Sequence, residues 1–401
     1  MGSELVTSLL LLLVVSRVCG ELAQRWGQPA VVGELLSGIL LGPAALNLLS
    51  VSPELKGISM LGVFLLLLLA GMETRIEDLL DAVRGRGVWV AVMGFFIPLL
   101  LGIVVGTVFR MDHLKTAFLG LCLAITALPV SVRILMDLGK LQTDIGQRII
   151  GTAVADDMAA LLLLGVLFSL SGKPASWASM SGPMALALLR TLLFMGLVVG
   201  THRLLWYSTG VVPTSRKLLD TLIANLKGKE TLFAAAVLFV LVFASVSEAV
   251  GFHFVVGTFF GSMLLGREIL GPENYREVHK TASGITMGFL APVFFATLGL
   301  QLELPSLGDL PLLAAVLACA FLGKMLGGFW GGRLAGLASP ESWTLGYGIN
   351  ARGFMALVAA DIALSAGFIG PDLFSVLVLM GIVTTMAAPP LLKHAFSKLE
   401  S

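Results

Sequence analysis

Charged residues are scarce in this chain: Asp, Glu, Lys and Arg make up 13% of its 401 residues, against about 25% in soluble domains. Cysteine is equally rare, and the three cysteines (Cys19, Cys122 and Cys319) lie in apolar segments without CxxC spacing, which argues against a disulfide framework or a thiolate zinc site. The five histidines show no metal-ligand spacing. With a net charge of +1 and no basic run, the sequence indicates no nucleic-acid partner.

Apolar residues dominate instead: 57% of the chain is hydrophobic and its mean hydropathy is +0.96. A helix of about 20 apolar residues crosses the ~30 Å hydrocarbon core of a bilayer. The sequence therefore predicts an all-α polytopic membrane protein with about thirteen transmembrane helices, at residues 4–20, 29–49, 57–72, 87–109, 115–138, 145–171, 183–207, 231–250, 252–270, 283–302, 309–337, 343–367 and 372–393.

Basic residues are distributed unequally between the two ends of these spans. Four lie in connections on the side of the N-terminus and nineteen on the opposite side, while Arg190, Lys324 and Arg352 lie within spans. Cytoplasmic connections are enriched in Lys and Arg, so the N-terminus is predicted to be outside and the C-terminus in the cytoplasm.

The two halves of the chain resemble each other. VVGELLSGILLG at 31–42 matches VVGTFFGSMLLG at 255–266, and the separation of positions 31 and 255 defines the repeat offset. A second block, 57–72, parallels 284–300 with one extra residue. Two blocks in the same order indicate an internal repeat. Each copy has six spans, and one linker span lies between the copies. The second copy therefore enters the membrane from the opposite side. We therefore expect inverted repeats, an architecture of secondary transporters.

Spans 5 and 12 carry helix-weakening residues at matched positions. Span 5 contains TALPVSVRIL with Pro129 at its centre, and span 12 contains GINARGFMAL after Gly346. Proline removes a backbone donor and glycine weakens a helix. Both spans are therefore predicted to be discontinuous and to cross, with free N–H and C=O groups beside a site. An ordinary proline kink is the alternative for span 5 alone.

Two adjacent carboxylates, Asp156 and Asp157, lie in the apolar segment Ile145–Leu170, whose one other charge is Arg148. One charge at the bilayer centre costs about 2.5–3.5 kcal/mol on insertion scales. Two neighbouring carboxylates at that depth need water, a bound cation or a proton each. The pair therefore predicts an ion site, with a helix-packing hydrogen bond as the competing interpretation.

Two basic residues lie within later spans. Lys324 is at the centre of span 11, too deep to reach either surface, and the two aspartates are its candidate partners. It either takes part in ion exchange or only neutralises one aspartate. Arg352 follows the break in span 12, where a guanidinium suits backbone carbonyls and helix C-termini, so a structural role fits it at least as well as a functional one.

Other polar residues complete the set of candidates. Thr126 and Asn350 lie at the two breaks, where they are candidates to contact the ion or the end of a half-helix. Gln301 and Glu303 either line an entrance or form a solvated loop edge. Glu248 and Asp361 are isolated acids to which the sequence assigns no role.

Four segments resemble the bacterial monovalent cation:proton antiporters related to NapA and the Kef systems: GELLSGILLGP (33–43), TAVADDMAALLLLGV (152–166), APVFFATLGLQLEL (291–304) and INARGFMALVAA (349–360). The resemblance covers essentially the whole chain, and the Asp-Asp pair combined with the span 11 lysine is its most specific part. It implies a homodimer in the bacterial inner membrane that serves pH homeostasis and needs no cofactor beyond the transported cation and proton.

The resemblance also implies roles and domains. Asp157 would be the principal site for the cation and the proton, and Asp156, a further candidate sodium ligand, would pair with Lys324 in one protonation state. Thr126 would lie near the crossing of the broken spans. Helices of a dimerisation scaffold would occupy 1–86 and 231–308, mobile core helices 87–171 and 309–401, and a linker helix with a cytoplasmic loop 172–230.

Two departures from the family pattern are visible. Relatives often carry glutamate directly after the Arg-Gly of span 12, where this chain has Phe354 and Met355. The sequence also ends at Ser401 without the nucleotide-sensing domain of Kef-type potassium systems, which favours a constitutive antiporter over ligand-gated potassium efflux.

The leading hypothesis is exchange of Na+ (or Li+) for H+, since a carboxylate either holds a proton or binds a hard cation through oxygen. K+/H+ exchange is the alternative within transport. A cation channel or a regulatory membrane protein would leave the repeat and the paired breaks unexplained. An intramembrane aspartyl protease is disfavoured, because adjacent residues on a helix point about 100° apart and cannot share one water. The chain is thus expected to be a transporter and not an enzyme.

Overall fold

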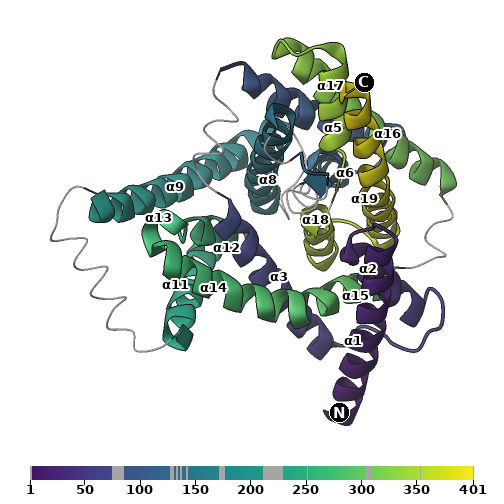
Figure 1. Ribbon diagram of the computed structural model, residues 1–401. Coiled ribbons are helices and arrows are strands. Elements are labelled where there is room, and N and C mark those ends of the chain that lie inside the picture. Colours follow the sequence, from purple (N-terminus) through teal and green to yellow (C-terminus); the bar gives the residue numbers. More distant parts are fainter. Residues whose placement is uncertain are drawn as a thin grey trace. The chain divides into compact units, whose positions relative to one another are not determined.

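A computed structural model shows how the chain folds (Figure 1). It describes residues 2–74, 85–126, 131, 134–135, 138–140, 143–170, 177–210, 229–250, 252–302, 309–352 and 354–400. The regular elements of these residues are helices, which confirms the all-α class. Eight helices are long and apolar enough to cross a membrane, and they lie in predicted spans 1, 3, 4, 6, 8, 10, 11 and 13. Shorter apolar helices lie in spans 2, 5, 7, 9 and 12. The total of thirteen spans stays a prediction.

The chain forms two compact units, the first from Met1–Ser59, Glu77–Leu164 and Pro292–Ser401 and the second from Met60–Ile76 and Gly165–Ala291. The first unit contains α1 (Gly2–Arg25), α2 (Ala30–Leu41), the 3-10 turn η1 (Gly85–Gly87), α5 (Val88–Val108), α6 (His113–Ala124), most of α8 (Asp144–Leu170), most of α15 (Ala291–Leu300), α16 (Leu310–Leu334), α17 (Ser339–Gly348), α18 (Phe354–Ser365) and α19 (Pro371–Glu400). The second contains most of α3 (Pro53–Glu73), α9 (Trp177–Gly210), α11 (Lys229–Val250), α12 (Phe254–Met263), α13 (Arg267–Leu270), α14 (Pro272–Ile285) and the π-helical segment η2 (Thr286–Leu290).

Glycines hold α16 against α5 in the first unit. Along the α16 face that meets α5, glycine recurs on successive turns, at Gly323, Gly327 and Gly331. A methyl group on Gly327 would lie 2.6 Å from the Met93 carbonyl oxygen, and one on Gly331 would lie 2.6 Å from the Val90 Cα atom. The two helices therefore approach backbone to backbone, as small residues allow between membrane helices.

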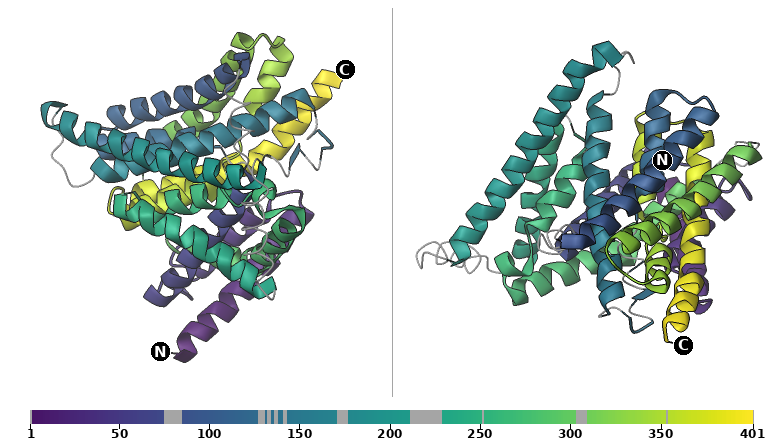
Figure 2. Two further views of the ribbon diagram at one scale, coloured as in Figure 1. Left: turned by 90° about the vertical axis from the view of Figure 1, so that its left-hand side faces the viewer. Right: turned by 90° about the horizontal axis from the view of Figure 1, so that it is seen from above.

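A second row of glycines on α16 faces α17. A methyl group on Gly332 would lie 2.7 Å from Ser342 Oγ, and one on Gly328 would overlap Gly346. Because α17 follows α16 after a short turn, the two helices form an antiparallel hairpin, which can be followed in both figures (Figures 1 and 2).

Two helical hairpins, one in each unit, repeat the same close contact. Within the first unit, Gly33 of α2 lies directly against the Cys19 carbonyl oxygen of α1. Within the second, Gly257 of α12 lies directly against the Phe243 carbonyl oxygen of α11. The repeat offset relates the two glycines to each other, and it also relates the two carbonyls.

The third helix of each repeat packs against the other repeat. Gly299 of α15 meets the Leu35 carbonyl oxygen of α2 within the first unit, and Gly71 of α3 meets the Phe259 carbonyl oxygen of α12 within the second. Leu35 and Phe259 are related by the repeat offset, and each of the two glycines is the penultimate residue of its block, 57–72 or 284–300. This reciprocal packing reproduces both pairs of blocks of the internal repeat.

The apolar pattern misplaces three helix boundaries. Span 29–49 begins as α2, but the helix ends at Leu41, where Gly42 turns to extended backbone before Pro43. In span 252–270, α12 ends at Met263, and α13 is a separate turn of helix. Conversely, the helix of span 10 begins at Pro272, because its first turns are amphipathic and carry Glu273, Arg276 and Lys280. Hydropathy detects apolar runs, whereas backbone breaks and caps end a helix.

Candidate functional site

The two predicted helix breaks meet in the first unit. Helix α6 ends at Ala124 and Ile125 is extended, whereas α17 ends at Gly348 and regular helix resumes at Phe354. The last residues of α6 and α17 are related by the repeat offset. The Thr126 hydroxyl lies 3.3 Å from the Ile349 carbonyl oxygen, and the Ser131 hydroxyl lies 3.3 Å from that of Gly348. Span 12 is thus discontinuous, and its break contacts residues of span 5.

Pro129, the predicted cause of the break in span 5, lies outside the described residues. The interruption is nevertheless visible at Ile125 and Thr126, which precede it. Helical backbone is present again at Ser131 and at 134–135.

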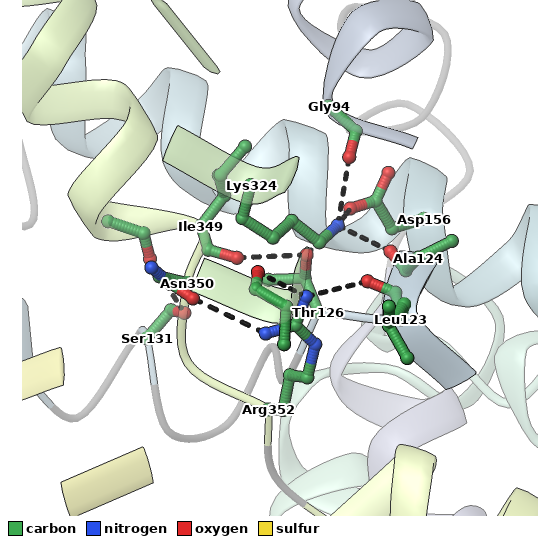
Figure 3. Close-up of polar contacts among 12 residues, drawn as sticks. Gly94, Leu123, Ala124, Thr126, Ser131, Asp156, Lys324, Ile349, Asn350 and Arg352 are labelled. Atoms are coloured by element: carbon green, nitrogen blue, oxygen red, sulfur yellow. Dashed lines mark hydrogen bonds and ion pairs between the residues drawn. The ribbon is translucent and has the colours of Figure 1, made fainter. Parts of the chain in front are cut away.

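Lys324 lies at the centre of the site, and its side chain is fully buried. The close approach of α16 and α5 brings its Nζ atom within 3.1 Å of the Gly94 carbonyl oxygen. The same atom donates to the Ala124 carbonyl oxygen at the end of α6 and lies 2.6 Å from Asp156 Oδ2. Figure 3 shows the three contacts converging on the nitrogen. A lysine ammonium has three donors, so every one of them has an acceptor.

Asp156 is correspondingly well satisfied. Its Oδ2 atom accepts from Lys324 and from the Thr126 hydroxyl, which lies 2.6 Å away, and 1% of the residue is exposed. A hydroxyl donates one hydrogen, and the shorter of its two contacts assigns that hydrogen to Asp156 rather than to the Ile349 carbonyl. Removing one partner of a buried ion pair costs about 3–5 kcal/mol, so the Asp156–Lys324 pair anchors α8 to α16.

Asp157, the next residue on α8, differs from Asp156 in one respect. It is 3% exposed, and its buried Oδ1 atom has no hydrogen-bond partner. Among the described residues no donor is bonded to either of its carboxylate oxygens. A buried carboxylate without donors is costly unless it carries a proton or binds a cation. Of the two aspartates, Asp157 is therefore the one with a buried carboxylate oxygen that has no hydrogen-bond partner.

Arg352 links the break in span 12 to helices α6 and α16. Its NH2 nitrogen lies 2.7 Å from the Leu123 carbonyl oxygen and 2.8 Å from that of Ala320, and its NH1 nitrogen lies 3.3 Å from Asn350 Oδ1 (Figure 3). A fixed positive charge at the end of α6 suits the negative end of the helix dipole. These contacts correspond to the structural option that the sequence left open for Arg352.

The structure thus brings together five sequence-predicted residues: Thr126, Asp156, Lys324, Asn350 and Arg352. Asp157 is adjacent on α8, and Glu303 lies outside the described residues. Sequence reasoning missed the backbone acceptors of Gly94 and Ala124, which a sequence does not mark. It also missed Thr385 of α19, whose hydroxyl lies 2.5 Å from the Arg352 carbonyl oxygen.

A buried carboxylate pair with a lysine, located where two interrupted helices meet in a polytopic helical fold, defines a secondary ion transporter. Comparison with known proteins gives the family: the sodium/hydrogen exchanger transmembrane model matches residues 9–398, and the chain belongs to this family of monovalent cation/proton antiporters. It is accordingly a multi-pass membrane transporter and not an enzyme.

Some relatives match over nearly their whole length. The Na(+)/H(+)-K(+) antiporter GerN of Bacillus cereus is 31% identical over 99% of this chain and 97% of its own. The Na(+)/H(+) antiporter of Enterococcus hirae is 29% identical over 98% of this chain and 99% of its own. Among solved structures, the sodium proton antiporter MjNhaP1 of Methanocaldococcus jannaschii shares the fold, with a TM-score of 0.68 at 18% identity, covering 98% of this chain and 97% of that one.

Proposed function

We propose that the chain exchanges Na+ (or Li+) for H+ through Asp157. The observation that carries this proposal is the contrast between the two aspartates. Asp156 accepts hydrogen bonds from Lys324 and Thr126, whereas Asp157 is equally buried and has an oxygen without a hydrogen-bond partner. A site of this kind holds one positive charge at a time, either a proton or an oxygen-coordinated cation.

This arrangement makes the two substrates competitors. Protonation of Asp157 removes the charge that attracts sodium, and bound sodium excludes the proton. The apparent affinity for sodium should therefore fall as the proton concentration on the same side rises. Asp156 serves as a further sodium ligand in those states in which Lys324 releases it.

The transport cycle is proposed to be alternating access around this fixed site. The reciprocal glycine contacts between equivalent positions of the two halves support an inverted repeat, and the matched ends of α6 and α17 support two crossing half-helices. In this scheme core helices at 87–171 and 309–401 move against scaffold helices at 1–86 and 231–308. A homodimer, an outside N-terminus and the bacterial inner membrane belong to the same proposal.

Potassium is the second candidate cation. Carboxylate, hydroxyl and carbonyl oxygens suit either alkali ion, and the relative that is 31% identical bears the name Na(+)/H(+)-K(+) antiporter. Transport with each ion supplied separately decides between them.

The test is proton movement in proteoliposomes with an imposed pH gradient, titrated with sodium, lithium and potassium. Asp157→Asn preserves volume but removes the exchangeable charge, and we expect exchange to fall to the level of protein-free liposomes. Asp144→Asn, an exposed position at the start of the same helix, is the matched control and should retain exchange within about twofold. Normal exchange by an assembled Asp157→Asn protein would refute Asp157 as the carrier.

A further inference from the structure

A further intramembrane carboxylate lies outside the Asp156–Lys324 site. Asp361 belongs to the apolar helix α18, about two turns after its first residue Phe354, which places it roughly 10 Å along the helix from the break. It lies toward the connection 366–370, and it makes none of the hydrogen bonds of the Lys324–Asp156 network. An ionisable residue at membrane depth calls for a functional account and a named partner.

The partner is Gln301, which follows the last residue of α15. Its Nε2 atom lies 3.3 Å from Asp361 Oδ1 and 3.4 Å from the Thr297 carbonyl oxygen one turn earlier. The amide's two donors are therefore both engaged, which fixes the side chain. Among the described residues, Gln301 is the one hydrogen-bond donor to Asp361. Asp361 Oδ2 and Gln301 Oε1 have no hydrogen-bond donor among the described residues. Both are oxygens of the kind that alkali cations prefer.

The surroundings suit passage rather than permanent binding. Asp361 is half-buried, so water reaches it more readily than Asp157. Among the residues that the structure describes, Lys56 at the start of α3 is the basic residue whose charge acts on Asp361. A nearby positive charge weakens the hold of a carboxylate on a cation, and conduction requires binding that is favourable enough to enter but weak enough to leave.

We propose that Asp361 and Gln301 form an antechamber that receives the monovalent cation or the proton between Asp157 and the solution on the side of the 366–370 connection. This inference rests on the proposed exchange function and adds a second, one-sided ion site to it. The carboxylate raises the local concentration of positive ions at the mouth, and Gln301 is a positioning residue that holds the carboxylate in place.

A one-sided antechamber has a thermodynamic signature. A substitution in an exchanger cannot change the equilibrium constant of the exchange reaction that it catalyses. A loss of apparent affinity for sodium on one side, at unchanged maximal rates, must therefore be matched by a loss of apparent affinity for protons on that side, in the proportion set by the exchange stoichiometry. A site that gathers both cations confines this matched loss to its own side, whereas the loss of an acid that only stabilises the fold would not be confined to one side.

The experiment first identifies the side. A Gly370→Cys variant, in a chain with Cys19, Cys122 and Cys319 replaced by Ala, is labelled with an impermeant maleimide in right-side-out and everted vesicles. Half-maximal sodium and proton concentrations are then measured from each side for Asp361→Asn. The control is Asp372→Asn, an exposed carboxylate in the first turn of α19 after the same connection.

For Asp361→Asn we expect both half-maximal concentrations to rise by roughly three- to tenfold on the labelled side and by less than about twofold on the other. Gln301→Ala should cause a smaller rise on the same side, and Asp361→Glu and Asp372→Asn should resemble the parent. No rise, an equal rise on both sides, or a rise on the opposite side would each overturn the proposal. If Asp361→Asn does not assemble, Gln301→Ala decides by the same criteria. Failure of the exchange function itself shows separately, as a parent protein without sodium-driven proton movement.

Discussion

The Lys324 ammonium is saturated with acceptors, whereas the Asp157 carboxylate beside it has a buried oxygen without a donor. The sequence singled out these residues as candidates, because charges in apolar runs are rare and conspicuous. It did not divide the roles between the two aspartates except through family resemblance. That division depends on which aspartate faces Lys324 and Thr126, and adjacent residues on a helix differ in direction by about 100°.

Thr126 tests the division of roles. Thr126→Val keeps the shape of the side chain but removes the donor 2.6 Å from Asp156 Oδ2. A hydrogen bond to a charged group contributes about 1.5–3 kcal/mol, so we expect sodium-driven exchange in proteoliposomes to fall by roughly ten- to a hundredfold. Thr126→Ser restores the hydroxyl and should recover most of the rate. Equal rates for Val and Ser would show that the hydroxyl is dispensable.

Among the helices, the ends of α6 and α17 were the most predictable feature, since Gly346, Gly348 and the conspicuous proline mark spans 12 and 5. The closeness of α16 to α5 was not predictable, although the glycines of α16 are plain in the sequence. A glycine permits close approach, but its partner becomes known only in the fold, here the backbone of Met93 and Gly94. The Gly94 carbonyl that Lys324 contacts lies on this same interface.

Gly327→Ala tests whether this helix contact positions Lys324. The added methyl group would lie 2.6 Å from the Met93 carbonyl oxygen and 2.9 Å from the Gly94 Cα atom, so α5 and α16 must separate. Overpacking of this kind costs about 1–3 kcal/mol. We expect a lower unfolding temperature in detergent and weaker exchange. Gly200→Ala on α9, where nothing lies within 4 Å, should leave both unchanged. An unchanged Gly327→Ala protein would mean that the interface yields without moving the lysine.

Across the whole chain, the internal repeat is the feature that the sequence and the structure support independently. The VVG and LLG triplets defined the repeat offset, and the same offset relates the Gly33–Cys19 contact to the Gly257–Phe243 contact. The exchange of partners between α2 and α15 and between α12 and α3 could not be foreseen. Apolar segments of similar composition do not reveal which neighbour each one packs against.

The Lys324–Asp156 pair bears on the net charge moved in one transport cycle. If Asp157 releases one proton and the Lys324–Asp156 pair a second when one sodium binds, a turnover moves charge and responds to membrane potential. The motivating contact is the 2.6 Å separation of Lys324 Nζ and Asp156 Oδ2 within a fully buried pair. Lys324→Gln removes one titrating group and leaves Asp156 to keep a proton in its low-dielectric surroundings.

The Lys324→Gln variant should therefore lose exchange or become electroneutral. An imposed potassium-diffusion potential in sodium-loaded proteoliposomes would then leave its rate unchanged while accelerating or slowing the parent. Lys393→Gln, an exposed position on α19, controls for the loss of a positive charge elsewhere and should behave like the parent. If Lys324→Gln retains both the rate and the potential response of the parent, the lysine is a structural counter-charge, and the second proton has to come from another group.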